Sequence, residues 1–373
     1  MKTAVIILSV WLASQQVMAQ DTLSVSLTFT GDIMQHDTQI YGAFDPLTAR
    51  YDYKPCFEKI RSELSEADLT IGNLELTLGG PPYKGYPQFS APDELLEGLK
   101  YAGYDVLVTA NNHSVDRGKK GLERTVHLLD SAGFQHTGTF RDTLEWLNEY
   151  PLVLRARGFS FSLLNYTYGT NGLKVYPPNI VNRIDRRQIR KDLEKAKSQG
   201  SDAIIVFMNW GLEYKSLPDS SQQNLADFCF RNGAKMVIGA HPHVLQPMEW
   251  RKESDQLVAY SLGNFVSAQY DRYKNGGAIL HVTLKKPAGG TAASIADVSY
   301  SLEYVYRAAN QRMTYHILPV HQFENDTTFV RRKAAHDYMI QFRDDSRLLL
   351  GRENKNVRER NYLAQPSQAS GRP

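Results

Sequence analysis

Residues 235–243, KMVIGAHPH, begin with a short apolar run and end in two histidines that are separated by one residue. An apolar run of this length, closed by Gly239, is typical of a buried strand. Glycine lets the backbone approach its neighbours closely where the strand ends. Two imidazoles on a tight loop can point at a shared ion, and His is a common ligand of borderline metals. The stretch therefore predicts His241 and His243 as metal ligands at a strand end.

Four other predicted strands also end in side chains that can bind a metal or donate an amide. These side chains are Asp32, Asn73 with Glu75, Asn112 with His113, and Asn209. In open α/β sheets, ligands bind beyond the carboxyl ends of the strands, so the five strand ends are expected to converge on one crevice. A single polar residue at a strand end is more often a turn or a cap, but five in series favour a site.

The residue types suggest a division of roles within this crevice. Asp32 and Glu75 offer hard oxygen ligands, and a carboxylate can bridge two ions that lie ~3.5–4 Å apart. Asn112 would add a neutral carbonyl oxygen. We expect His113 to act as an acid for a leaving group, with Asp116 orienting it. The chemistry predicted is metal-dependent hydrolysis with one or two divalent ions (Mn, Zn or Fe).

The rest of the chain alternates short apolar runs with amphipathic helices and becomes strand-rich after about residue 256. The predicted strands are 25–30, 68–71, 104–110, 159–164, 202–208, 235–238, 256–260, 278–284, 298–306 and 313–320. The main predicted helices are 55–67, 118–132, 186–199 and 220–231. This order indicates an α/β fold with mixed sheets and helices outside, in place of an all-parallel doubly wound sheet.

The chain ends and the composition set further expectations. Residues 1–19 combine a positive start, an apolar run and a small-residue cleavage site, which predicts a cleaved export signal and a periplasmic or extracellular protein. We expect one domain over 23–325, a C-terminal helix within 326–350, and a polar, disordered tail over 351–373. The net charge of +3 is spread over 373 residues, so nucleic-acid binding is not expected. Cys56 and Cys229 are expected to be separate buried thiols.

Six motifs together resemble the CapA family of poly-γ-glutamate capsule biosynthesis. They are TGDIM (30–34), GNLE (72–75), ANNH (110–113), NWGLEY (209–214), GAHPH (239–243) and YSLGNF (260–265). The resemblance covers roughly residues 23–265. It implies a metallophosphatase-like αββα sandwich of two mixed β-sheets flanked by helices. It also implies a role in making, exporting or trimming an anionic polymer such as poly-γ-glutamate, with a membrane-bound capsule synthesis or export complex as an expected partner.

The chain departs from this pattern at two positions. Related metallophosphatases carry a His two residues after the first Asp, where this chain has Met34, and His36 is expected to be a solvated loop residue instead. Relatives also carry a His where this chain has Asn209, and an amide oxygen binds a borderline metal less tightly than imidazole does. The departures leave a non-catalytic assembly factor open beside the hydrolase, and the fold alone also admits a periplasmic phosphatase.

Several further residues are candidates for substrate contact. Asn73 is expected to face the substrate, and Asn264 either lines the crevice or belongs to a turn. Glu213 either binds an amine or guanidinium group of a ligand or pairs with a nearby base. Four aromatic residues either form a wall over the substrate or belong to the core; they are Trp210, Tyr214, Tyr166 and Tyr168.

Overall fold

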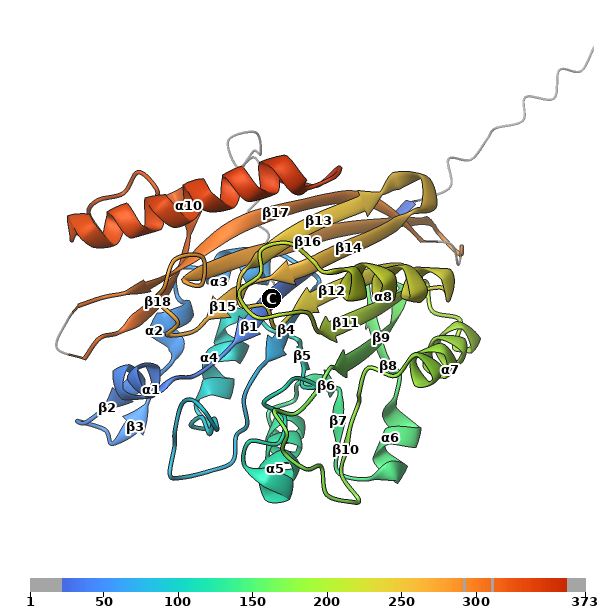
Figure 1. Cartoon of the computed structure of the whole chain (residues 1–373), viewed down its shortest axis with the longest axis horizontal. Helices are drawn as coiled ribbons and strands as arrows, with labels where there is room; N and C mark the ends of the chain where they lie inside the picture. The colour runs from blue at the N-terminus through green and yellow to red at the C-terminus, as the bar shows by residue number, and fades with distance from the viewer. Residues whose placement is uncertain (1–21, 291–292, 310–311, 361–373) are drawn as a thin grey trace, which may run out of the picture.

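The computed structural model describes residues 22–290, 293–309 and 312–360, and within these residues two β-sheets pack face to face between helices (Figure 1). The predicted export signal lies outside the described residues. The first sheet runs in the order β18 (Tyr315–Pro319), β17 (Ser294–Arg307), β16 (Gly276–Pro287), β1 (Thr22–Ile33), β4 (Leu69–Leu74), β5 (Val106–Val108) and β6 (Gln135–Thr137). The short strands β15 (Asn264–Val266) and β19 (Arg358–Glu359) pair with β1 and β17.

The second sheet runs in the order β13 (Leu245–Arg251), β14 (Gln256–Leu262), β12 (Met236–Ala240), β11 (Ala203–Asn209), β9 (Phe159–Thr167) and β8 (Leu152–Ala156). Both sheets are mixed: β1, β4, β5 and β6 are parallel, as are β9, β11, β12 and β14, whereas β16, β17, β8 and β13 pair antiparallel. Two small pairs complete the strands: β2 (Phe44–Asp45) with β3 (Arg50–Tyr51), and β7 (Thr139–Phe140) with β10 (Ile180–Val181).

Three apolar layers hold the sandwich together. Inward-facing residues of both sheets, such as Phe29 on β1 and Phe207 on β11, form the central layer. The outer face of the first sheet is covered by α2 (Lys54–Phe57), α3 (Arg61–Ser65) and α4 (Leu95–Ala102). The outer face of the second sheet is covered by α7 (Arg186–Ser198) and α8 (Ser220–Arg231). The predicted αββα sandwich of two mixed sheets is therefore confirmed.

The remaining helices lie around this core. They are α1 (Asp37–Ala43), α5 (Gly118–Ser131), α6 (Thr143–Glu149), the 3-10 turn η1 (Lys252–Ser254), α9 (Val320–Phe323) and α10 (Lys333–Glu353). Helix α10 lies along β17 of the first sheet and β13 of the second (Figure 1). No helix among the described residues is long and apolar enough to cross a membrane.

Local signals explain several of these elements. Helix α8 begins at Asp219, whose carboxylate accepts a hydrogen bond from the backbone N–H of Gln222 while the Gln222 side chain returns to the Asp219 N–H. This reciprocal capping satisfies backbone donors that the first turn leaves unpaired. Strand β13 was not predicted because Pro247 interrupts the run. A proline is tolerated here because β13 is an edge strand of its sheet.

Two other sequence predictions differ from the structure. The helix predicted over 55–67 is two short helices, α2 and α3, with a turn between them. The tail predicted over 351–373 is wrong for residues 351–360, because the buried Val357 and a hydrogen bond from Met248 N–H to Asn354 Oδ1 at 2.8 Å hold them against the sandwich. The remainder of that tail lies outside the described residues. Cys56 and Cys229 are separate buried thiols, as expected.

Candidate metal centre

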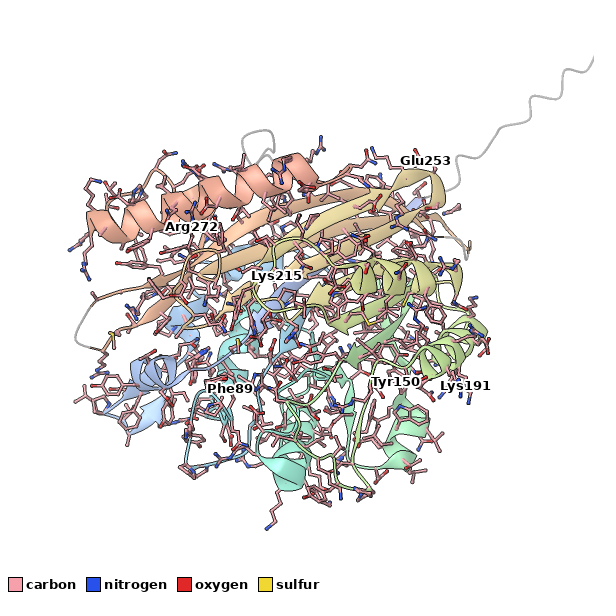
Figure 2. All side chains as sticks on the ribbon, in the orientation of Figure 1. Phe89, Tyr150, Lys191, Lys215, Glu253 and Arg272 are labelled. Carbon is pink, nitrogen blue, oxygen red and sulfur yellow. The ribbon has the colours of Figure 1, made fainter. Side chains whose placement is uncertain are left out.

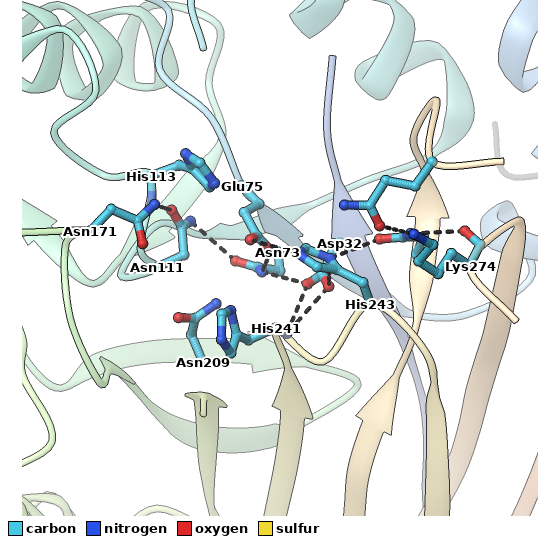
Figure 3. A network of polar contacts seen from close by, with 12 residues as sticks. Asp32, Asn73, Glu75, Asn111, His113, Asn171, Asn209, His241, His243 and Lys274 are labelled. Carbon is cyan, nitrogen blue, oxygen red and sulfur yellow. Dashed lines mark hydrogen bonds and ion pairs between the residues drawn. The ribbon is translucent and has the colours of Figure 1, made fainter. Parts of the chain in front are cut away.

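The carboxyl ends of β1 and β4 bring two buried carboxylates together. At the end of β1, Gly31 lies so close to Gly263 that a Cβ atom there would stand 1.9 Å from the Gly263 carbonyl oxygen. Glycine is therefore required immediately before Asp32. The amide of Asn73 donates to Asp32 Oδ1 at 2.8 Å and to Glu75 Oε2 at 3.1 Å, so it bridges the two acids (Figure 3).

The two acids differ in their proton affinity. Burial favours a raised pKa for Asp32, but the hydrogen bond and the charge of His243 outweigh it and hold this pKa below its ordinary value. Burial, followed by the charge of Asp32, raises the pKa of Glu75 well above its ordinary value. When two carboxylates share a buried site, their pKa values move apart in this way because both cannot easily be charged at once. A cation bound between them would stabilise both negative charges.

The loop after β12 places both histidines beside these acids. His243 Nδ1 lies 3.2 Å from Asp32 Oδ2, and His243 Nε2 lies 3.8 Å from Glu75 Oε1. The backbone N–H of His241 points at Asp32 Oδ2 over 3.2 Å. Both histidines have positive φ, at 96° for His241 and 58° for His243. Such backbone conformations are costly for residues other than glycine and concentrate at functional sites.

The donor atoms of this cluster fit a metal ion. Glu75, His241 and His243 each offer a ligand atom within 4.8 Å of the other two. Ligands of one ion, bound at ~2.0–2.6 Å, lie no more than about 5 Å apart. Three acceptors, Glu75 Oε1, His241 Nδ1 and Asn112 Oδ1, are completely buried and have no hydrogen-bond partner. Buried acceptors without partners are rare and costly, and a divalent cation would satisfy all three.

Asn209 ends β11 and lies beside His241 (Figure 3). Its Oδ1 atom lies 2.9 Å from Thr167 Oγ1, but the same hydroxyl lies 2.9 Å from the Gly169 carbonyl oxygen. One hydroxyl proton cannot serve both acceptors, while the buried Nδ2 of Asn209 has no partner. Rotating the amide by half a turn lets Nδ2 donate to Thr167 and turns Oδ1 toward the position without a partner. In this orientation Asn209 is an oxygen donor beside His241.

The loop after β5 carries the predicted acid. His113 Nδ1 lies 2.7 Å from Asp116 Oδ2, which also accepts the Phe89 backbone N–H at 2.7 Å. Burial raises the pKa of Asp116 in spite of its hydrogen bond to His113. Because Nδ1 faces Asp116, the Nε2 atom of His113 remains for proton exchange with a ligand. The structure thus gives His113 the orienting partner that the sequence predicted.

Three substrate candidates are buried in the structure, and only for Asn73 did the sequence leave no alternative to substrate contact. Trp210 is buried in the core, where its Nε1–H donates to the Tyr260 carbonyl oxygen at 2.9 Å, so it cannot contact a substrate. Asn264 is also buried, and its Oδ1 atom lies 3.0 Å from His243 Nδ1. Asn73 is fully engaged by the two acids. Asn264 and Asn73 therefore position site residues and do not face the crevice.

The other candidates lie at the rim or in the core. Tyr214 and Tyr168 remain half exposed, with ring centroids 6.0 Å from His243 and 4.5 Å from His241 respectively. Glu213 is exposed next to Tyr214. Tyr166 belongs to the core, where its hydroxyl donates to Asp192 at 2.7 Å.

Sequence reasoning placed His36 in solvent, which is wrong. His36 is partly buried beside the crevice, and its ring meets the edge of Phe89, which in turn packs on His113. Its Nδ1 atom lies 3.1 Å from Gln39 Oε1 and 3.2 Å from the backbone nitrogen of Ala268, so both polar contacts of the ring engage Nδ1. Among the described residues, the cluster with metal-ligand spacing is Glu75, His241 and His243 and does not include His36, so His36 does not replace the missing ligand at Met34, which is itself in the core.

Two buried asparagines were missed altogether. Asn111 donates to the Leu74 carbonyl oxygen at 2.8 Å and accepts the His113 N–H at 3.0 Å, which ties the acid loop to β4. Asn165, on β9, accepts the Ala110 N–H at 2.6 Å and so links the two sheets behind the site. The signal available for Asn165 was a polar residue within a buried strand, and for Asn111 a polar residue in the loop after a strand; neither identifies its partner.

Residues 26–269 match the family described as bacterial capsule synthesis protein PGA_cap. The chain belongs to this family. It is 28% identical over 310 residues to the capsule biosynthesis protein CapA of Bacillus anthracis, covering 74% of this chain and 72% of the relative. It is 27% identical over 282 residues to the PGA biosynthesis protein CapA of Bacillus subtilis (strain 168), covering 73% of this chain and 70% of the relative.

Solved structures give more distant similarities. The calcineurin-like phosphoesterase YfkN from Bacillus subtilis aligns at a TM-score of 0.47 and 15% identity, over 88% of this chain and 98% of that one. The NAD nucleotidase NadN of Haemophilus influenzae aligns at a TM-score of 0.45 and 13% identity, over 88% of this chain and 61% of that one. The site of this PGA_cap family member is therefore interpreted from its own residues.

Proposed function

We propose that this protein is an exported, metal-dependent hydrolase of capsule or exopolymer biosynthesis that acts on an amide-linked anionic polymer of the poly-γ-glutamate type. The single observation that carries the proposal is a set of three buried acceptor atoms without hydrogen-bond partners in the crevice at the strand ends. They are Glu75 Oε1, His241 Nδ1 and Asn112 Oδ1. Membership of a capsule synthesis family supports the polymer class.

The residues of the crevice have two proposed roles, to hold the metal and to supply a proton. Asp32, Glu75 and His243 would hold one divalent ion, and Glu75, His241, Asn112 and Asn209 would hold a second. A bound divalent ion would supply Lewis-acid polarisation of the substrate's carbonyl or phosphoryl oxygen. His113, oriented by Asp116, would give a proton to the leaving nitrogen. Burial of these groups excludes bulk water and strengthens each electrostatic contact.

The test combines metal analysis with hydrolysis assays on two substrates. Purified protein supplied with Mn²⁺ or Zn²⁺ is expected to shorten poly-γ-glutamate, as measured by gel filtration, and to lose this activity in His113→Ala. The matched control is His127→Ala, because His127 lies on α5 outside the crevice. Hydrolysis of p-nitrophenyl phosphate without cleavage of the polymer would instead identify a phosphatase and contradict the proposal.

A second candidate function rests on the two departures from the family pattern. Met34 is in the core and Asn209 offers an amide in place of an imidazole, which weakens metal binding. A chain that binds the polymer but hydrolyses neither substrate would be an assembly or export factor, acting with a membrane-bound capsule synthesis complex. Polymer binding without cleavage in the assay above selects this alternative.

A further inference from the structure

Helix α7 concentrates positive charge on the outer side of the second sheet. Its 13 residues hold six cations and two carboxylates, whereas the whole chain has a net charge of only +3. One of the carboxylates, Asp192, is buried and accepts hydrogen bonds from the Tyr166 hydroxyl and the Gln188 amide, each at 2.7 Å. Figure 2 shows Lys191 at the outer edge of the molecule. Four exposed cations dominate this face: Arg186, Arg187, Arg190 and Lys191.

These four side chains have no acidic partner. Among the described residues none of them donates a hydrogen bond or lies within 4 Å of a carboxylate. The exposed carboxylate of Glu194 forms no ion pair within that distance either. That of Asp185 is engaged by the backbone N–H groups of Arg187 and Gln188, at 2.8 and 3.0 Å. The cations are therefore available to an external anion.

Two of the arginines share one aromatic ring. The guanidinium carbons of Arg186 and Arg190 lie 5.3 and 5.6 Å from the centroid of the Phe228 ring on α8. An aromatic face attracts a guanidinium group through its quadrupole but supplies no negative charge to neutralise it. The ring thus holds two like charges on the same side of α7.

This arrangement is unfavourable for the helix by itself. Arg186 and Arg190 are four residues apart, as are Arg187 and Lys191, and like charges at this spacing destabilise a helix. Arg186 and Arg187 also lie in the first turn, where the helix dipole disfavours cations. Local rules are broken in this way chiefly at functional surfaces. An anion bound along α7 would offset both effects.

The basic face of α7 begins beside the crevice. The Ile184 N–H donates to the Thr167 carbonyl oxygen at 2.9 Å, and the Thr167 hydroxyl lies 2.9 Å from Asn209 Oδ1. Arg183 Nη1 donates to Thr170 Oγ1, also at 2.9 Å, in the loop that follows β9. These contacts fix the start of α7 to the end of β9. A helix of this length extends about 20 Å away from the crevice.

We infer that the exposed face of α7 is a docking surface for an anionic polymer and leads that polymer to the crevice. A guanidinium group can bind a carboxylate through two parallel hydrogen bonds, so a polymer with one carboxylate per unit matches a row of arginines. An anionic membrane fits less well, because a membrane-surface helix also needs an exposed apolar side. Here Ile189 and Leu193 are buried. That the polymer is a polycarboxylate rests on the proposed function.

The test measures binding of poly-γ-glutamate to chelator-treated protein at low ionic strength, where exposed charges are little screened. The α7 variant combines Arg186→Gln with Arg190→Gln. Its matched control combines Lys333→Gln with Arg352→Gln, which removes the same charge from exposed positions of α10, a helix well apart from α7 in Figure 1. The α7 variant is expected to bind the polymer roughly three- to thirtyfold more weakly than the wild type, the effect of two exposed ion pairs.

The control variant is expected to bind as the wild type does. The α7 variant should unfold at no lower temperature than the wild type, because it relieves repulsion within the helix. A lower unfolding temperature would mean that the two arginines stabilise the fold, and it would overturn the inference. So would a wild type that does not bind the polymer, an α7 variant that binds it as tightly as the wild type, or an equal loss in the control.

Vesicles of phosphatidylglycerol and phosphatidylcholine provide the second probe. If the α7 variant loses binding to these vesicles but keeps its affinity for the polymer, α7 faces a membrane and the inference is wrong. Assays with Mn²⁺ separate the inference from the proposed function. Polymer binding that depends on α7 but is never followed by cleavage refutes only the hydrolase. Cleavage with the same KM in the wild type and the α7 variant refutes only the docking surface.

Discussion

Asn209 is the residue at which the chain departs from its family pattern inside the crevice itself. It lies beside His241, and its hydrogen bond with Thr167 leaves one end of the amide buried without a partner (Figure 3). An amide oxygen adds no charge and is a poorer donor than imidazole for Zn²⁺ or Mn²⁺. The second ion position, around His241, is therefore expected to bind more weakly than the position beside Asp32 and His243.

Replacing this amide by imidazole should strengthen the weaker position. Asn209→His is expected to raise the affinity for Zn²⁺ or Mn²⁺ by roughly the 10–100-fold that changes around a metal site produce. The measurement is isothermal titration of chelator-treated protein, with Asn148→His on the exposed side of α6 as control. Equal affinity and stoichiometry in the wild type and Asn209→His would show that residue 209 does not touch a metal.

At the scale of elements, the site depends on the fit of one sheet against the other. The loop after β5, which carries Asn112 and His113, belongs to the first sheet, whereas β11 and β12 belong to the second. Asn165 on β9 crosses between them: it accepts the Ala110 N–H at 2.6 Å and donates to the Phe207 carbonyl oxygen at 3.1 Å. A Cβ atom at Gly138 would stand 2.1 Å from Asn165 Oδ1, so glycine is required there.

Removing this link should cost stability. Asn165→Ala leaves a buried backbone N–H without a partner, and we expect the free energy of unfolding to fall by about 1–3 kcal/mol. Urea denaturation of metal-free protein measures the change, with Asn148→Ala, at an exposed position of α6, as comparison. A loss of stability no greater than that of the comparison variant would mean that Asn165 does not connect the sheets.

The elements show what sequence patterns could and could not reveal. Strand ends were predictable because apolar runs stop at polar residues, and this was enough to group Asp32, Glu75, His241 and His243. The environment of Trp210 could not be predicted, because the sequence pattern of a strand followed by tryptophan is the same whether that tryptophan lies in the core or on the wall of a cleft. Strand β13 was hidden by Pro247, and the position of His36 depended on Ala268, which is remote in the sequence.

At the scale of the whole molecule, buried histidines should make stability depend on pH. Burial lowers the pKa of His36 to about 4 from its ordinary value near 6.5. Below pH 6.5 the unfolded chain takes up a proton that the folded chain refuses, so stability is complete above pH 6.5 and falls as the pH falls toward 4. At pH 5, His36 is expected to lower the free energy of unfolding by about 2 kcal/mol relative to its value above pH 6.5.

This pH effect is testable in chelator-treated protein. The wild type is expected to lose stability between pH 7 and pH 5 in urea denaturation, and His36→Asn should lose about 2 kcal/mol less over the same range. His127→Asn, on the exposed part of α5, serves as control. If His36→Asn and the wild type show the same pH dependence, burial does not lower the pKa of His36 in the folded protein.

The central claim is that the crevice at the strand ends is a divalent metal centre and that Glu75 is one of its ligands. The most direct test is isothermal titration of chelator-treated wild type and Glu75→Gln with Zn²⁺ and Mn²⁺. The wild type is expected to bind at least one ion, and Glu75→Gln should bind at least roughly 10–100-fold more weakly, since even partners outside the ligand set have effects of that size. A wild type that binds neither ion, or a Glu75→Gln variant that binds as tightly as the wild type, would contradict the account.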